Sequence, residues 1–137
     1  MRGSARLRLV LAEVADGIRS SAEGDFRDLL KRARLPMPLF NPCLYVGETF
    51  LAKPDAWWPD AGVAAEVDSR EWHLSPQSWE LTMHRHVQMG RQGIIPLHFT
   101  PRRIRTEPAE VVAAIKDALI TGRQRPPLAV RAVPSAR

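Results

Sequence analysis

Residues 53–68 read Lys-Pro-Asp-Ala-Trp-Trp-Pro-Asp-Ala-Gly-Val-Ala-Ala-Glu-Val-Asp, and this stretch decides the fold. Its centre, Pro-Asp-Ala-Gly at 59–62, has the composition of a turn between two strands. The segment after the turn, 63–68, is mostly apolar, so we expect a largely buried strand. Pairing of the two strands across the turn would bring Asp55 beside Glu66. Because a buried carboxylate is costly unless it is paired or binds a metal, the stretch also indicates a functional site.

Two strand-like segments precede residue 58. They cover residues 39–46 and 49–57 and flank Gly47-Glu48, which reads as a tight turn. Pro42 has no N–H to donate to a neighbouring strand, so the first segment lies at a sheet edge or begins after this proline. We therefore expect the strands 39–46, 49–57 and 63–68 to form an antiparallel meander.

Apolar residues at helical spacing predict two helices ahead of the strands, over 5–18 and about 21–34, with Pro36 ending the second.

Capping residues define two further helices. Ser75 as N-cap and Pro76 at the first helical position open one of them, and Gly93 closes it. Thr106 is expected to cap the last helix, over about 107–121, which has acidic residues near its positive end. The helix that starts at Pro76 is expected to pack inward through Trp79, Met83, His86 or Val87, and Gly90.

Residues 94–99 (Ile-Ile-Pro-Leu-His-Phe) read as a fourth strand, parallel to the third because a helix connects the two. The order ααβββαβα predicts an α/β fold with a mixed four-stranded sheet and helices on both faces. We expect an N-terminal helix at 1–20 as a possible linker to an upstream module, a main domain at 21–121, and a flexible Pro/Arg-rich tail at 122–137.

The composition is that of one soluble basic domain. The chain has 137 residues, of which 45% are hydrophobic, and a net charge of +5. A basic domain is compatible with binding to nucleic acid. No apolar run reaches the length of a membrane span, and the lone Cys43 cannot form a disulfide within the chain. We therefore expect a cytoplasmic protein with no membrane partner.

The order of elements and the placement of the acids resemble the restriction-endonuclease-like superfamily, which is named for its PD-(D/E)xK motif. Pro54-Asp55 matches the start of that motif, and Glu66 stands at its (D/E) position. More narrowly, residues 20–120 are similar to the small bacterial domains known as DUF559, which group with the very-short-patch-repair mismatch endonucleases. The matching features are Ser21-Ala22-Glu23, Pro54-Asp55, Glu66-Val67-Asp68, Trp72-His73 and Leu97-His98-Phe99.

The resemblance implies a metal-dependent DNA endonuclease, which acts in repair or in defence against foreign DNA. Asp55, Glu66 and Asp68 are the expected ligands of Mg²⁺ or Mn²⁺, since carboxylate oxygens suit such hard cations. The metal would activate a water and stabilise charge at the phosphorus. His73 is a candidate general acid or base, and Glu23 is expected to reach the site from its helix.

Each of these residues has a competing structural explanation. Asp55 would otherwise be a strand-end acid after a proline, and Asp68 would otherwise be a turn-forming residue. His73 would pack beside its neighbouring tryptophan, and Glu23 would complete a capping box that begins at Ser20.

DNA is the expected partner, with a homodimer or an upstream winged-helix module as further possibilities. His84 and His86 are two positions apart and do not share a helix face, so they are poor joint metal ligands. His98, within a strand, reads as a core histidine. The candidate contacts to the DNA backbone, each otherwise a solvated charge, are Lys53, Arg70, Arg85, Arg102, Arg103 and Arg105.

Two departures from the family pattern keep a second hypothesis open. Asp68 occupies the place of the motif lysine, and Ser69 stands where DUF559 domains usually have glycine. Without that lysine and glycine, the nuclease fold would serve as a catalytically weak DNA- or protein-binding module, for example in a toxin–antitoxin or defence system.

Overall fold

The computed structural model describes residues 21–68 and 75–135. The predicted helix 5–18, the capping residue Ser20, Arg70 and His73 lie outside these residues. Residues 21–32 are helical. The further elements are β1 (Leu39–Phe40), β2 (Cys43–Val46), β3 (Thr49–Ala52), β4 (Ala56–Trp58), β5 (Val63–Val67), α2 (Pro76–Arg91), β6 (Ile95–Phe99), α3 (Pro101–Thr106), α4 (Pro108–Arg123) and β7 (Arg131–Val133).

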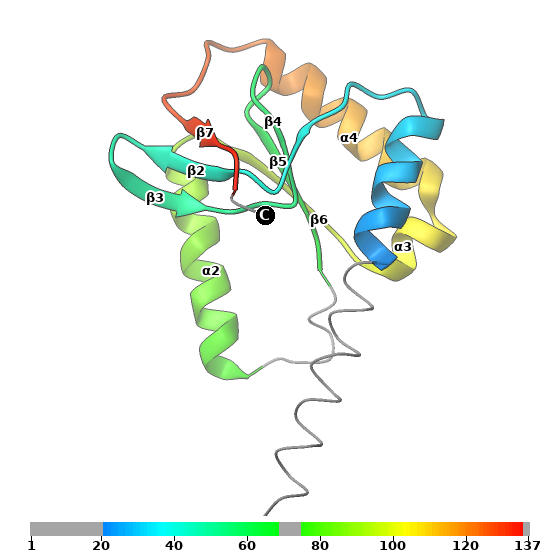
Figure 1. Cartoon of the computed structure of the whole chain (residues 1–137), viewed down its shortest axis with the longest axis horizontal. Coiled ribbons are helices and arrows are strands. Elements are labelled where there is room, and N and C mark those ends of the chain that lie inside the picture. The colour runs from blue at the N-terminus through cyan, green and yellow to red at the C-terminus, as the bar shows by residue number, and fades with distance from the viewer. Residues whose placement is uncertain (1–20, 69–74, 136–137) are drawn as a thin grey trace, which may run out of the picture.

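The core of the fold is a four-stranded mixed sheet, as predicted (Figure 1). Its strand order is β1-β4-β5-β6, with antiparallel pairs except for the parallel pair β5/β6. The expected antiparallel hairpin around residues 59–62 and the expected parallel crossover through α2 are both confirmed. In the register of the hairpin, Ala56 pairs with Ala65, which brings Asp55 to the level of Glu66.

The two segments predicted as single strands, 39–46 and 49–57, are each broken in the middle. Asn41 has a φ of 55°, and Pro42 and Pro54 next to the breaks are fully buried. The Asn41 N–H donates to the carbonyl of Asp55 at 3.0 Å, which joins the two breaks. Prolines interrupt a hydrogen-bonded ladder, so the long hairpin bends here. Its outer half becomes a second sheet of order β3-β2-β7.

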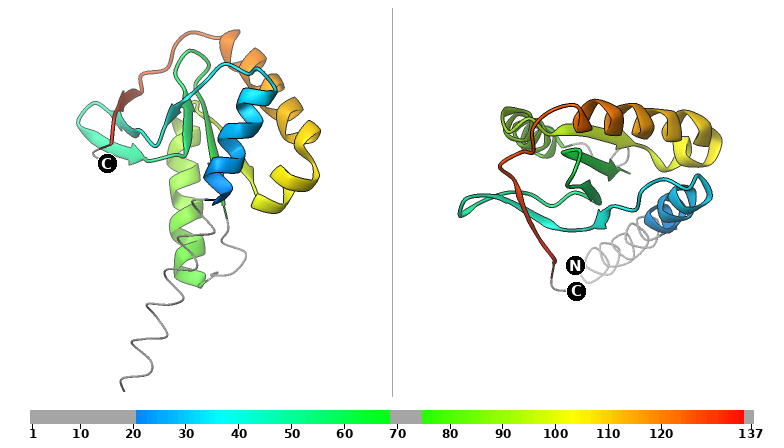
Figure 2. Two further views of the ribbon diagram at one scale, coloured as in Figure 1. Left: turned by 45° about the vertical axis from the view of Figure 1, so that its right-hand side comes forward. Right: turned by 90° about the horizontal axis from the view of Figure 1, so that it is seen from above.

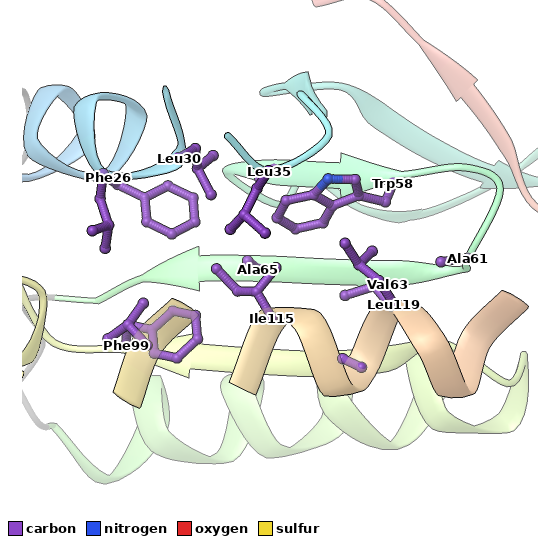
Figure 3. Packing of buried hydrophobic residues seen from close by; sticks show 14 of the residues in the cluster. Phe26, Leu30, Leu35, Trp58, Ala61, Val63, Ala65, Phe99, Ile115 and Leu119 are labelled. Atoms are coloured by element: carbon purple, nitrogen blue, oxygen red, sulfur yellow. The ribbon is translucent and has the colours of Figure 1, made fainter. Parts of the chain in front are cut away.

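One face of the core sheet packs against the 21–32 helix, α3 and α4. Phe26 and Leu30 of the helix meet Phe99 of β6 and Ile115 of α4 in one cluster (Figure 3). The indole N–H of Trp58 donates to a backbone carbonyl at 2.7 Å, which satisfies its polar atom inside this core. The cluster explains why the strand residues 63 and 65, which point the same way, are both apolar.

The opposite face is covered by α2 and the second sheet. Ala64 of β5, Trp57 of β4, Leu44 of β2 and Met89 of α2 belong to a separate cluster. Figure 2 shows α2 and the 21–32 helix on opposite sides of the core sheet, so the prediction of helices on both faces is confirmed.

Helix α2 has the predicted ends but not the predicted inner face. Ser75 Oγ accepts a hydrogen bond from the Ser78 N–H, and Gly93 lies beyond the helix with a φ of 83°. The residues buried in α2 are Thr82 and Met89. The predicted inner residues Trp79, Met83 and Val87 are 54%, 43% and 55% exposed. The prediction is wrong for these three residues, whereas His86, the predicted alternative to Val87, is half-buried and lies near the sheet.

Two predictions for the last part of the chain are also wrong. Thr106 does not cap the last helix: it ends α3, and its hydroxyl donates to the carbonyl of Arg102. Helix α4 begins at Pro108. Residues 131–133, expected in a flexible tail, form β7 and pair with β2. Val130, just before this strand, and Ala132 within it pack on the second cluster. This burial explains why the segment forms a strand instead of a flexible tail.

Gly122 is the position where α4 packs closely on the turn at 59–62. A β-carbon at position 122 would collide with the backbone of Ala61, whereas one at Gly90 of α2 would meet nothing within 4 Å. We expect Gly122→Ala to destabilise the protein by about 2 kcal/mol or more. Gly90→Ala should stabilise it by about 0.5–1 kcal/mol, because alanine favours the helix. Urea unfolding measures both, and equal stabilities would contradict this packing.

Candidate metal centre

Glu66 is a buried carboxylate at the end of a core strand. It is 7% exposed. Side chains alternate along a strand, so Glu66 lies on the same face of β5 as Ala64, which is the face that α2 covers. The parallel register pairs it with His98 of β6, so both side chains lie on that face. A carboxylate in this position requires partners that compensate for the lost hydration.

Arg85 and His98 are two of those partners. Arg85 Nη2 donates to Glu66 Oε2 at 2.9 Å, and His98 Nδ1 lies 3.6 Å from the same oxygen. The side chains of Arg85 and His98 are each 31% exposed, against 10% for Glu66. A charge-assisted hydrogen bond from a guanidinium is among the stronger ones in proteins, so Arg85 holds the carboxylate against α2.

His86, beside Arg85 on α2, completes a group of three potential metal ligands. Its ring lies 4.3 Å from that of His98, centroid to centroid, at an interplanar angle of 53°. The ligand atoms of Glu66, His86 and His98 all lie within 4.8 Å of one another. Ligand atoms around a tetrahedral ion are about 3.4 Å apart, given metal–ligand bonds of about 2.1 Å. Small side-chain rotations would therefore suffice to enclose an ion.

The donor set differs from the one expected from the sequence. Two imidazole nitrogens and one carboxylate oxygen suit Zn²⁺, Mn²⁺ or Fe²⁺, whereas Mg²⁺ prefers an all-oxygen shell. Within residues 21–68 and 75–135, the expected set Asp55, Glu66 and Asp68 does not form such a group. Glu66 is the member that the two sets share.

The other two expected acids make contacts that hold the backbone at the end of β5. Asp55 is half-buried, and its Oδ2 accepts a hydrogen bond from the Val67 N–H at 2.7 Å. The Asp68 N–H donates to the carbonyl of Phe99 at 2.9 Å, which extends the pairing of β5 with β6. Asp55 thus lies at the strand end where it was predicted, with one carboxylate oxygen directed at the backbone.

The remaining predicted residues that belong to the described ranges lie on several different segments. Glu23 is half-buried on the 21–32 helix, and Lys53 is exposed. Arg85, predicted as a DNA contact, pairs with Glu66 in this structure, and its contact with DNA stays a prediction. The arginines Arg102, Arg103 and Arg105 are exposed on α3, where Arg103 pairs with Glu107 at 2.8 Å.

Sequence reasoning missed His86 and His98 as a pair. The sequence relates His86 only to its helical neighbour His84, whereas its partner lies on β6. A parallel pairing of the strands that begin near Val63 and Ile95 places position 66 opposite position 98. Helical spacing also offers His86 as an inner residue of α2, but no sequence pattern places it beside His98.

No family model, no curated protein and no solved structure matches the chain. Among the described residues, no helix combines the length and the apolar character needed to cross a membrane.

The donor set generates a prediction about metal preference. Isothermal titration of the protein should give tighter binding of Zn²⁺ and Mn²⁺ than of Mg²⁺. His98→Ala should weaken Zn²⁺ binding at least about tenfold, since it removes one of three ligands. His84→Ala is the matched control, because this exposed histidine of α2 is not in the group. Equal losses in the two variants would rule out this site.

The Arg85–Glu66 pair generates a prediction about stability. Glu66→Gln should lower the free energy of unfolding by about 2 kcal/mol, because Arg85 loses its charged partner in a half-buried setting. Glu107→Gln disrupts the exposed Arg103–Glu107 pair and should cost below about 0.5 kcal/mol. Guanidinium chloride is unsuitable since it screens charge, so urea unfolding is the measurement. A smaller loss for Glu66→Gln than for the control would contradict the importance of the buried pair.

Proposed function

We propose that the chain is a metal-dependent endonuclease that nicks or cleaves DNA, with its metal held by Glu66, His86 and His98. The observation that carries the proposal is the position of these three side chains at one end of the parallel β5/β6 pair, with the Asp55 carboxylate directly before the adjoining strand β4. A divalent ion bound there would polarise a phosphoryl oxygen and make its water more acidic.

The surroundings of the site supply the other requirements of phosphodiester cleavage. Asp55 directly precedes β4, the strand next to β5, and its carboxylate is anchored through one oxygen at the Val67 N–H. This anchoring orients the second oxygen and makes Asp55 the candidate that positions an attacking water. Arg85, already at the site, supplies positive charge for a phosphate.

The strand order supports placing the chain with the nuclease-like domains that its sequence resembles. The antiparallel meander followed by a parallel strand is the arrangement predicted from the sequence, with Pro54-Asp55 at the break before β4 and Glu66 on β5. The exposed arginines of α3 add a cationic surface suited to the DNA backbone.

The Arg85–Glu66 ion pair favours a second candidate function. A guanidinium at 2.9 Å already neutralises the carboxylate, so the site is electrostatically satisfied by the chain's own residues. A nuclease fold in this state would act as a DNA- or protein-binding module without cleavage.

A plasmid-nicking assay separates the two functions. Wild-type protein should convert supercoiled plasmid to the nicked form with Mn²⁺ or Zn²⁺. Glu66→Gln should lower the rate at least about a hundredfold, because it removes a charged metal ligand. Glu110→Gln, an exposed acid of α4, is the charge-matched control with wild-type activity expected. Cleavage that persists in Glu66→Gln would contradict the proposed site, and metal-independent DNA binding without cleavage would support the binding module.

A further inference from the structure

A groove borders the candidate metal centre at Arg85 of α2. It lies between the second sheet and α2, has a volume of about 660 Å³, and is lined by Thr49 and Phe50 of β3 and by Arg85 and Gln88 of α2, among others. Arg85 therefore belongs both to the groove and to the ion pair with Glu66. The groove exists because the long hairpin bends at Pro42 and Pro54 and carries β3 over α2.

The chemistry of the groove suits an anionic strand with unpaired bases. Its lining contains Arg85 and amide side chains such as Gln88, and none of the described residues that line it is an aspartate or glutamate. Phe50 is 55% exposed, and its ring is held edge-on against Tyr45 at a centroid distance of 5.8 Å. A fixed, exposed aromatic face stacks with a base that is not in a duplex, and an arginine beside it binds the phosphate.

We propose, on the basis of the function proposed above, that this groove binds a single-stranded segment of the nucleic-acid substrate and that Arg85 exchanges partners between Glu66 and a substrate phosphate. A cation entering the centre competes with the guanidinium for Glu66 Oε2, the oxygen that Arg85 and His98 both approach. The Arg85 side chain is 31% exposed and borders the groove, so rotation about its side-chain bonds is enough to transfer it. Metal and strand then bind cooperatively.

Arg85→Gln is the variant that tests the exchange. Fluorescence anisotropy measures the affinity for a labelled ten-nucleotide oligo(dT), with and without saturating Zn²⁺, and isothermal titration measures the affinity for Zn²⁺. For the wild-type protein we expect Zn²⁺ to raise oligo(dT) affinity about fivefold or more. In Arg85→Gln this increase should vanish, and Zn²⁺ alone should bind more tightly than in the wild type because its competitor is gone.

Two controls keep the test specific. Arg123→Gln removes the same charge from α4, where this arginine pairs with Asp60, and should leave both affinities unchanged. Arg85→Lys keeps the charge without the guanidinium fork and should retain part of the metal-dependent increase. Thermal unfolding of each variant verifies that it folds.

Phe50→Ala tests the groove without any metal. This exposed side chain can be removed with little effect on folding, and we expect about a tenfold loss of oligo(dT) affinity. Unchanged affinity in Phe50→Ala, or tighter binding of a ten-base-pair duplex than of oligo(dT), would overturn the groove assignment.

The outcomes also distinguish this proposal from the endonuclease proposal. If plasmid is cleaved but Arg85→Gln retains the wild-type response to Zn²⁺, the exchange is wrong and the endonuclease proposal stands. If no metal binds, the endonuclease proposal and the exchange both fail, and Phe50→Ala alone decides the groove.

Discussion

The burial of the Glu66 carboxylate is the constraint on which the arrangement of the site depends. Its position on β5 follows from strand alternation, which directs it to the face that α2 covers. A carboxylate there must be matched by cationic or donor groups, and Arg85 and His98 approach the same oxygen. Helix α2 is therefore oriented by polar contacts as well as by apolar packing. One consequence is that its apolar residues Trp79 and Val87 remain half-exposed.

A second constraint, the bend of the hairpin at Asn41–Pro42 and Pro54–Asp55, connects the fold to its candidate functions. The inner half of the hairpin extends the core sheet, and the outer half pairs with β7 to form the second sheet. The same bend presents the Asp55 carboxylate to the backbone of β5 and places β3 beside α2. The candidate metal centre and the groove are thus two results of one interruption in the strands.

The relation between Arg85 and Glu66 links the two candidate functions. In the ion pair, the carboxylate is neutralised by the chain itself, which is the state suited to binding without cleavage. In the proposed exchange, a cation at Glu66 would make the arginine available to a phosphate in the adjacent groove. A single side chain on α2 would then separate a closed, self-compensated site from one that is open to the proposed substrate.

The sequence by itself determined the local structure: the turn at 59–62, the buried strand that follows it, the Ser75 cap and Gly93 end of α2, and the parallel pairing through that helix. It also indicated that Glu66 needs a partner, because that requirement follows from burial alone. The tertiary structure alone decided the bend that divides the hairpin into two sheets, the pairing of β7, and the grouping of His86 and His98, in place of Asp55 and Asp68, with Glu66 as potential metal ligands. Caps and turns depend on residues a few positions apart, whereas these later features depend on distances between elements far apart in the chain, which only the packing of the complete fold establishes.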